Sequence, residues 1–235
     1  MSDLVKTILT ALRNYIPALL AVISDPRVAI PERVGSRDDA LDAALAFFGI
    51  TLALSLLLQL PLLGPADDPV AVFGSLLVVR MLMFAVFTAC VVLAFRALGG
   101  RGGFVPTLCI SLYVNAPAYL VQVVTALMSR GLAARSEVID LADLQNPETR
   151  PVASAALAAA DPTTATLLVA TGFLGIGIVV AWFFYCWPIY RAEHRVSRAR
   201  SGVAYAVAFA AYLLSLWLGA NLMRGLHGAA LPAIV

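Results

Sequence analysis

Apolar residues in this chain form long runs separated by short polar connections, a pattern typical of helices that cross a membrane. A hydrocarbon core of roughly 30 Å requires about 20 apolar residues in helical form. The runs predict five spans, at residues 41–63, 71–95, 105–128, 163–190 and 203–223. The second span must include Arg80, because the uncharged residues that follow it are too few to cross the core alone.

The first 23 residues show a different pattern, in which apolar and polar side chains occupy opposite faces of one helix. We expect this amphipathic helix to lie along the membrane surface. Its apolar face could equally pack on the transmembrane bundle, and the two arrangements are compatible. Asp25, Pro26, Pro31 and Gly35 are expected to break the helix, so that residues 1–35 form a cytoplasmic amphipathic segment.

Composition supports the same class of protein. The chain is 61% hydrophobic and 13% charged, with a mean hydropathy of +0.91, which excludes an ordinary soluble domain. A net charge of +2 is too weakly basic to indicate a nucleic-acid partner. The prediction is an all-α, polytopic helical membrane protein. It has five transmembrane helices within residues 36–223, an extracytoplasmic insert at 129–161, a tail at 224–235 and an N-terminal amphipathic interfacial helix.

The distribution of Lys and Arg predicts the orientation. Eleven of these residues lie in the N-terminal segment and in the second-to-third and fourth-to-fifth connections, against four in the other connections and the tail, with Arg80 uncounted. Positive residues concentrate on the cytoplasmic side of a membrane. The N-terminus is therefore expected in the cytoplasm and, after five spans, the C-terminus outside.

The third span carries its strongly polar side chains on one helical face, apart from tyrosines. They are Thr107, Ser111, Asn115, Gln122 and Thr125, and we call this set the polar stripe. The stripe could line a polar path, or it could form hydrogen bonds between helices. Pro117 removes one backbone hydrogen bond and is expected to kink the span near Tyr113.

Arg80, Ser111, Asn115 and Gln122 form the candidate intramembrane polar site. An arginine inside a span could serve a permeation path or an internal ion pair, because an unpaired charge in the bilayer is costly. The alternative is that Arg80 extends to the outer face, toward Asp67 or Asp68.

Two features outside the core of the membrane are also candidates. Arg191, Arg195 and Arg198 are placed on one helical face beside Trp187 and Tyr190, where they could contact anionic lipid headgroups. Topology signal combined with an aromatic belt explains them as well. The four glycines around Arg101, between residues 99 and 103, could cradle a phosphate through backbone amides, or simply reverse the chain between two helices.

The sequence shows none of the motifs searched for in enzymes and metal sites. His194 and His227 are the only histidines and fall on opposite sides of the membrane, and three isolated cysteines give neither a disulfide framework nor a zinc site. Apart from Asp42 at the edge of the first span, no span contains Asp or Glu, the usual carboxylate of a coupled transporter. Glu193 and His194 are the only adjacent acid–base pair. No catalytic residue, cofactor or metal is expected.

GGRGGF at 99–104, the span containing Tyr113 to Pro117, and RAEHRVSRARSGVAYAV between the last two spans together resemble bacterial members of the Yip1 family of membrane proteins. The resemblance covers about residues 10–223. It implies five transmembrane helices with a cytoplasmic N-terminus. In eukaryotic relatives it implies binding to Rab-type GTPases and to one another during vesicle traffic. This chain lacks the acidic, aromatic N-terminal region and the Asp-Leu-Tyr-Gly-Pro stretch of those relatives, which weakens the case for a GTPase partner.

The sequence therefore favours a non-catalytic protein of the bacterial inner membrane that organises lipid or protein partners and forms homo-oligomers. The alternative is an uncoupled channel or facilitator with a path along the third span. A lipid-modifying enzyme, which could use only Glu193 with His194, is a third hypothesis.

Overall fold

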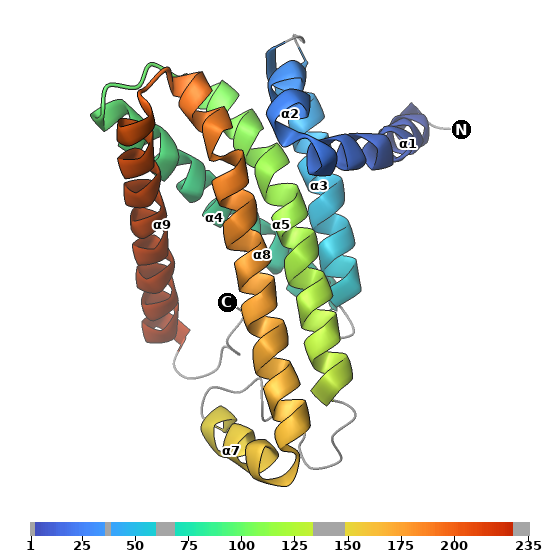
Figure 1. The fold of residues 1–235 in the computed structure, drawn as a ribbon. Helices are drawn as coiled ribbons and strands as arrows, with labels where there is room; N and C mark the ends of the chain where they lie inside the picture. The colour runs from blue at the N-terminus through green and yellow to red at the C-terminus, as the bar shows by residue number, and fades with distance from the viewer. Residues whose placement is uncertain (1–2, 36–38, 60–68, 134–148, 228–235) are drawn as a thin grey trace. The chain divides into compact units, whose positions relative to one another are not determined.

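A computed structural model describes residues 3–35, 39–59, 69–133 and 149–227; at some positions in its helices, Arg80 among them, only the backbone is described. The described residues form eight helices and contain no strand, as expected for an all-α protein (Figure 1). The helices are α1 (Asp3–Ser24), α2 (Pro26–Gly35), α3 (Ala40–Gln59), α4 (Pro69–Ala97), α5 (Phe104–Ala133), α7 (Arg150–Ala160), α8 (Pro162–His194) and α9 (Arg198–His227).

Three helices are long and apolar enough to cross a membrane: Ala40–Leu58, Phe104–Ala133 and Pro162–His194. They correspond to the expected spans at 41–63, 105–128 and 163–190, although residues 60–63 lie outside the described part. The other two expected spans, 71–95 and 203–223, lie within α4 and α9. The described residues of those helices do not by themselves qualify as spans, so the count of five stays a prediction.

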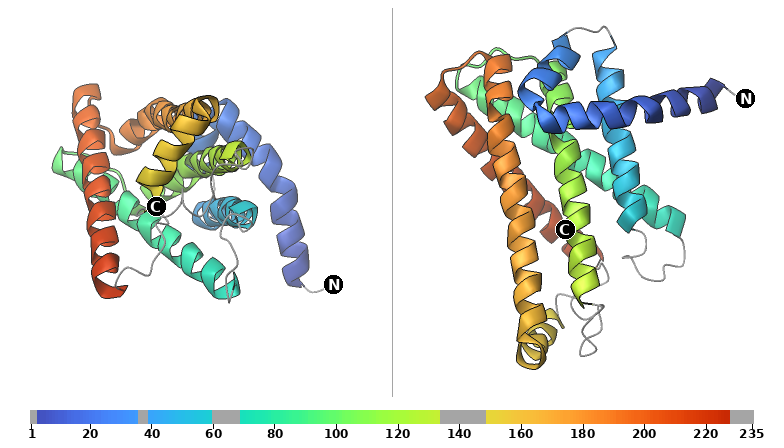
Figure 2. Two further views of the ribbon diagram at one scale, coloured as in Figure 1. Left: turned by 90° about the horizontal axis from the view of Figure 1, so that it is seen from below. Right: turned by 45° about the vertical axis from the view of Figure 1, so that its right-hand side comes forward.

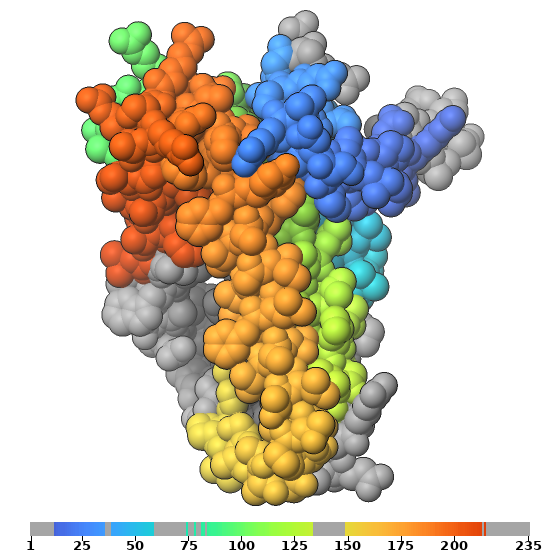
Figure 3. All heavy atoms as spheres, in the orientation of Figure 1, coloured from blue at the N-terminus to red at the C-terminus, as the bar shows by residue number. Residues whose placement is uncertain are grey.

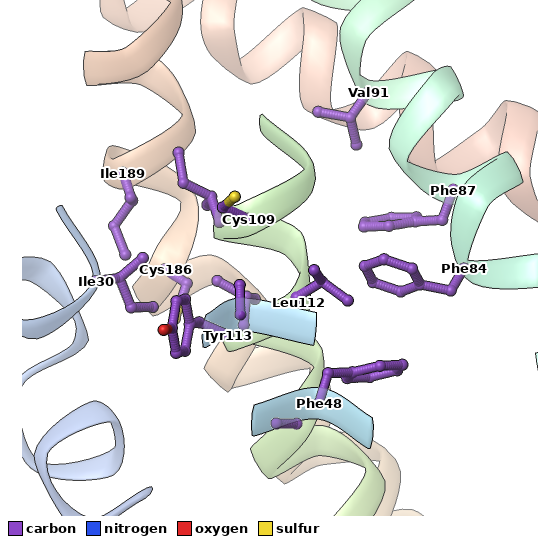
Figure 4. Packing of buried hydrophobic residues seen from close by; sticks show 14 of the residues in the cluster. Ile30, Phe48, Phe84, Phe87, Val91, Cys109, Leu112, Tyr113, Cys186 and Ile189 are labelled. Atoms are coloured by element: carbon purple, nitrogen blue, oxygen red, sulfur yellow. The ribbon is translucent and has the colours of Figure 1, made fainter. Parts of the chain in front are cut away.

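The chain divides into two compact units, and α5, α8 and α9 each contribute to both. The first unit comprises Met1–Leu120 with Ala181–Leu216, and the second comprises Val121–Val180 with Trp217–Val235. The core of the first unit is built from α1, α2, α3, α4, α5, α8 and α9, and Figure 4 shows how buried side chains of α2, α3, α4, α5 and α8 converge. Aromatic contacts connect these helices: Phe48 lies 4.8 Å from Phe84, and Phe47 lies 4.9 Å from Tyr113, measured between ring centroids.

Helix α1 runs crosswise to α3, as Figure 1 and the right-hand view of Figure 2 show. Its Tyr15 hydroxyl lies 2.9 Å from the Thr51 hydroxyl of α3, and the Tyr15 and Val22 side chains are buried. Leu12, Ile16, Leu20 and Ile23 follow one another at helical spacing on α1 and are exposed. One side of the helix therefore packs on the bundle, as one of the two expected arrangements requires, and another apolar stripe remains uncovered.

The expected break of the N-terminal helix is confirmed at Asp25 and Pro26, because α1 ends at Ser24; Pro31 does not break the chain further, because it lies inside α2, which ends at Gly35. Pro26 occupies the first position of α2, where the missing N–H has no partner to lose, and Pro31 removes only one further hydrogen bond. Tertiary contacts hold the short helix in place. Arg27 donates from Nε to the Tyr185 carbonyl of α8 at 3.1 Å, and its guanidinium lies 4.4 Å from the centre of the Tyr185 ring.

The second unit contains α7, the first part of α8 and the last parts of α5 and α9. Asp161 separates the two helices, and its Oδ1 accepts a hydrogen bond from the Thr164 amide at 3.0 Å, which caps the N-terminus of α8 as the sequence indicates. Hydrogen bonds from the Thr164 side chain and amide hold the pKa of the Asp161 carboxyl below its usual value. Of the insert expected at 129–161, residues 134–148 lie outside the described part of the chain.

Candidate functional site

The glycine turn, residues Gly99–Gly103, ends α4 and leads into α5. Gly99 has a φ of 88°, the left-handed conformation that a residue with a Cβ rarely adopts. The Gly100 amide donates to the Phe95 carbonyl at 2.8 Å and the Gly99 amide to the Arg96 carbonyl at 3.0 Å, so the turn satisfies carbonyls at the end of α4. The expectation of a tight chain reversal is confirmed here.

The turn also closes around the last residues of α8, 90 positions away in the sequence. The Arg101 amide donates to the His194 carbonyl at 3.0 Å, and the Gly103 amide lies 3.4 Å from Oε1 of Glu193, which accepts its hydrogen bond. Glu193 and His194 are therefore part of a structural junction. We define the junction as the glycine turn, Thr107 and residues 193–195. The sequence did not lead us to predict this contact between the turn and the end of α8.

His194 is the centre of the junction. Its ring is fully buried and stacks on Phe95 with the centroids 4.5 Å apart. The Thr107 hydroxyl donates its single hydrogen to the Gly103 carbonyl at 2.7 Å, so the contact of 3.0 Å between this hydroxyl and His194 Nε2 requires Nε2 to be the donor. In that tautomer Nδ1 is an acceptor, and it is buried without a hydrogen-bond partner among the described residues.

Two glycines are required because the imidazole approaches the turn so closely. A Cβ on Gly102 would lie 2.6 Å from Nδ1 and 2.8 Å from Cε1 of His194. A Cβ on Gly100 would lie 2.8 Å from the Phe95 carbonyl oxygen. The absence of side chains at these positions thus creates the space for His194. The backbone amides of Arg101 and Gly103 are occupied by α8, which leaves them unable to cradle a phosphate as well.

In the first unit, the polar stripe contacts α8. Ser111 is fully buried, and its Oγ accepts a hydrogen bond from the Tyr190 hydroxyl at 3.1 Å. Tyr190 is itself fully buried, so it is a core residue and not part of an aromatic belt. Asn115 is half-buried and donates to the Ser111 carbonyl at 2.8 Å. The polar stripe was expected either to line a polar path or to form hydrogen bonds between helices. The contacts of Thr107 and Ser111 match the second alternative.

The second unit contains the rest of the stripe. Gln122 is exposed, whereas Thr125 is half-buried and donates to the Val121 carbonyl at 2.8 Å. A Cβ on Gly175 of α8 would lie 2.5 Å from the Thr125 hydroxyl oxygen, so this glycine permits close packing of α5 and α8. A Cβ on Gly172 or Gly177, two other glycines of α8, would meet no atom within 4 Å among the described residues.

Near Pro117, helix α5 continues without interruption from Phe104 to Ala133. Pro117 has no N–H to donate to the Tyr113 carbonyl. The next carbonyl, that of Val114, accepts a hydrogen bond of 2.7 Å from Nε1 of Trp182. This is another bond between α5 and α8 within the first unit, and it buries the polar edge of the indole.

The expectation that Arg191, Arg195 and Arg198 share one helical face is wrong. Helix α8 ends at His194, Arg195 has a φ of 52°, and α9 begins at Arg198. The helices are separate because Ser197 caps the second one: its side chain accepts from the Arg200 amide at 3.5 Å and its carbonyl accepts from the Ser201 amide at 2.9 Å. Contact of these arginines with lipid headgroups stays a prediction.

Three further candidates are Arg80, a cluster of metal ligands and the cysteines. The side chain of Arg80 lies outside the described residues, so its pairing stays a prediction. Among the described residues, no cluster of three or more His, Cys, Asp or Glu side chains could hold a metal ion. None of the three cysteines is in a disulfide; Cys109 and Cys186 are buried, whereas Cys90 is half-buried.

Comparison with protein families decides the membership of this chain. Residues 20–225 match the family model of the Yip1 domain. The chain belongs to the Yip1 domain family. The match begins in α1 and extends into α9, so it includes the glycine turn, the polar stripe and the junction around His194. Searches of curated proteins and of solved structures give no match. Family membership and the apolar helices together identify this Yip1 domain protein as a membrane protein.

Proposed function

We propose that this Yip1 domain protein is a non-catalytic integral membrane protein that organises lipid or protein partners. In this proposal it crosses a bacterial inner membrane five times, with its N-terminus in the cytoplasm and its C-terminus outside, and it associates with copies of itself. Family membership supports the non-enzymatic membrane role. The observation that carries the proposal is the two-sided packing of α1.

Helix α1 is attached to the bundle on one side and uncovered on another. Tyr15 and Val22 are buried, whereas Ile16 and Leu20 are 55% and 59% exposed. A continuous apolar stripe of this kind, beside a membrane-spanning bundle, would not be left exposed to water without something to cover it. Lipid at the membrane interface, or an apolar partner inserted there, provides that cover. The helix is thus suited to collecting partners at the edge of the bundle.

Helix α8 supports self-association. Only 6% of its most apolar stretch is buried, and Phe173, Leu174 and Ile176 are each more than 60% exposed. In the space-filling view, the face of α8 that is turned to the reader is open over most of its length (Figure 3). Lipid chains cover some of this surface in a membrane, and a second copy of the chain could cover the rest. Such an arrangement needs neither a cavity nor a reacting group.

The buried contacts of the stripe speak against the channel alternative. Thr107 and Ser111 are used by His194 and Tyr190, and neither side chain is exposed. A polar path along this part of α5 would have to break both contacts. Asn115 and Gln122, which are more exposed, remain the residues through which that alternative would act.

The test uses the full chain reconstituted in vesicles of phosphatidylcholine and phosphatidylglycerol. Energy transfer from labelled protein to labelled lipid measures lipid enrichment, and transfer between two labelled copies measures self-association. The triple variant Leu12→Ser, Ile16→Ser, Leu20→Ser should lose enrichment or association, because it removes the exposed stripe of α1. Asn14→Ser, on the same helix and also exposed, is the matched control and should leave both signals unchanged.

Two results would contradict the proposal. Wild-type protein that neither enriches lipid nor self-associates, yet turns over a substrate, would show that it is an enzyme. Solute flux through the wild-type vesicles that is lost in Asn115→Leu would establish the channel alternative, whereas absence of wild-type flux removes it.

A further inference from the structure

A pocket of about 470 Å³ lies in the first unit, between the end of α2, the start of α5 and the end of α8. These three segments lie next to one another in Figures 1 and 2. The volume falls in the range of about 300–1,000 Å³ that is usual for small-molecule sites. The pocket adjoins the junction, because Arg101 of the glycine turn and Glu193 and Arg195 form part of its wall.

The lining combines an apolar interior with a charged edge. Ile110 and Ile189 contribute the apolar part and are almost fully buried. Arg101, Glu193 and Arg195 contribute the charges, and both arginines are exposed. Two guanidinium groups against one carboxylate leave the pocket with a net positive charge. A ligand that fits this lining has an anionic group and an apolar portion.

Within the described part of the chain, nothing occupies the guanidinium groups of Arg101 and Arg195. Neither forms a hydrogen bond or an ion pair with any residue in the described part of the chain. Glu193 is less available, because its Oε1 already accepts from the Gly103 amide. A guanidinium has a planar set of donors that matches the oxygens of a phosphate group. The charge pattern therefore favours a phosphate mono- or diester, and the carboxylate disfavours a polyphosphate.

The backbone of Arg195 gives an independent reason to regard this residue as selected for its side chain. The Arg195 amide donates to the Ala192 carbonyl at 3.2 Å and the Val196 amide to the Arg191 carbonyl at 3.4 Å. This is the hydrogen-bond pattern of a Schellman motif, whose left-handed position is usually glycine. Arg195 is the only residue other than glycine with a positive φ in the described part of the chain. Strain of this kind at a pocket indicates a role in binding.

We propose that the pocket binds the phosphate headgroup of an anionic phospholipid through Arg101 and Arg195, with part of the lipid's apolar region against Ile110 and Ile189. This inference deepens the proposed function, on which it rests, by giving one lipid-binding site a location away from the exposed stripe of α1. It also changes the lipid-contact set. Arg195 belongs to the site, whereas Arg191 and Arg198 do not line the pocket.

The experiment measures binding of dihexanoyl phosphatidylglycerol to the full chain in a neutral detergent by titration calorimetry. The double variant Arg101→Ala, Arg195→Gly removes both guanidinium groups. Glycine at position 195 relieves the left-handed strain, so this change does not weaken the end of α8. We expect binding to weaken by about tenfold to a hundredfold, the usual effect of losing charge-assisted hydrogen bonds. Arg191→Ala, Arg198→Ala removes the same charge outside the pocket and should leave binding unchanged.

Inorganic phosphate distinguishes the source of the headgroup. If the ligand is a lipid, phosphate at the same concentration should not displace dihexanoyl phosphatidylglycerol, because it has no apolar part. Equal competition by phosphate would overturn the lipid assignment. Equal weakening by the two double variants would show diffuse charge attraction instead of a site, and unchanged binding in Arg101→Ala, Arg195→Gly would overturn the proposal outright.

The α1 triple variant separates failure of this inference from failure of the proposed function. If the arginine variants have no effect but the α1 variant still loses lipid enrichment in vesicles, the pocket is refuted and the organising role stands. If the wild-type chain shows neither enrichment nor self-association in vesicles, the organising role fails, whatever the pocket binds.

Discussion

Substituting alanine for Gly102 tests the junction most directly. The new Cβ would lie 2.6 Å from Nδ1 and 2.8 Å from Cγ of His194, distances too short for contact without movement. The imidazole cannot withdraw freely, because it is stacked on Phe95 and bonded to Thr107. Gly102 has no positive φ, so the effect would be steric and not conformational.

The expected loss of stability can be worked from these contacts. Inserting a methyl group into a well-packed core costs about 1–3 kcal/mol. Displacing the ring also breaks its hydrogen bond to Thr107, worth about 0.5–1.5 kcal/mol. Alanine restricts the unfolded chain relative to glycine, which returns about 0.4–1 kcal/mol. The free energy of unfolding of Gly102→Ala should therefore fall by about 2 kcal/mol.

The assay is reversible unfolding of the full chain by SDS in mixed micelles, followed by circular dichroism. Gly49→Ala is the matched control: its Cβ would meet no atom within 4 Å, so it should be neutral or stabilising. In a His194→Ala background the space for the methyl group exists, and Gly102→Ala should then cost almost nothing. Wild-type stability in Gly102→Ala, or the same cost in both backgrounds, would refute the packing described for the junction.

Three further outcomes are expected. Tyr190→Phe should lower the free energy of unfolding by about 1 kcal/mol in the same SDS titration, because it removes the hydrogen bond to buried Ser111; an unchanged midpoint would mean that the bond is not formed in the micelle. Gly175→Val should destabilise by about 1–3 kcal/mol through its clash with Thr125, and restoring stability with Thr125→Ala in the same chain would identify that clash as the cause. The lowered pKa of Asp161 means that its cap stabilises α8 above the carboxyl's unfolded pKa and is lost as the pH falls through the folded pKa. Hydrogen exchange in the first turn of α8, corrected for intrinsic rates, should therefore increase on acidification in the wild type but not in Asp161→Asn, and equal responses would count against the cap.

The long helices could be predicted because each depends on a local pattern. Every expected span lies within one helix of the structure as far as its residues are described, and the amphipathic segment forms α1. The ends were less predictable, because turn chemistry and tertiary contacts decide them. Helix α8 continues beyond residue 190 to His194, which the glycine turn covers, and α2 continues through Pro31, which was expected to break the helix. A short helix of this kind is held by contacts such as that of Arg27 with Tyr185, which local sequence does not encode.

The site was predictable only in part, for the same reason. The spacing of polar residues located the stripe on one face of α5, but its partners Tyr190 and His194 are 79 and 87 positions away and carry no local signal. The glycines around Arg101 are equally consistent with a simple reversal, so their packing against an imidazole could not be inferred. One signal was available: Ser197 as a helix cap would have shown that the neighbouring arginines belong to two helices.

The last three turns of α8 hold three other elements of the first unit, and each contact uses different chemistry. Arg27 attaches α2 to Tyr185 by a cation–π contact and a hydrogen bond, Tyr190 bonds to α5 through Ser111, and His194 fills the space inside the glycine turn. A solute path between α5 and α8 would require these contacts to break, and this would expose His194 and Ser111 without their partners. A scaffold instead requires the contacts to stay intact while the outer surfaces of the protein exchange partners. Because the polar groups of these contacts hold the helices together, the fold is better suited to presenting α1, α8 and the pocket lined by Arg101 and Arg195 to partners than to passing solutes.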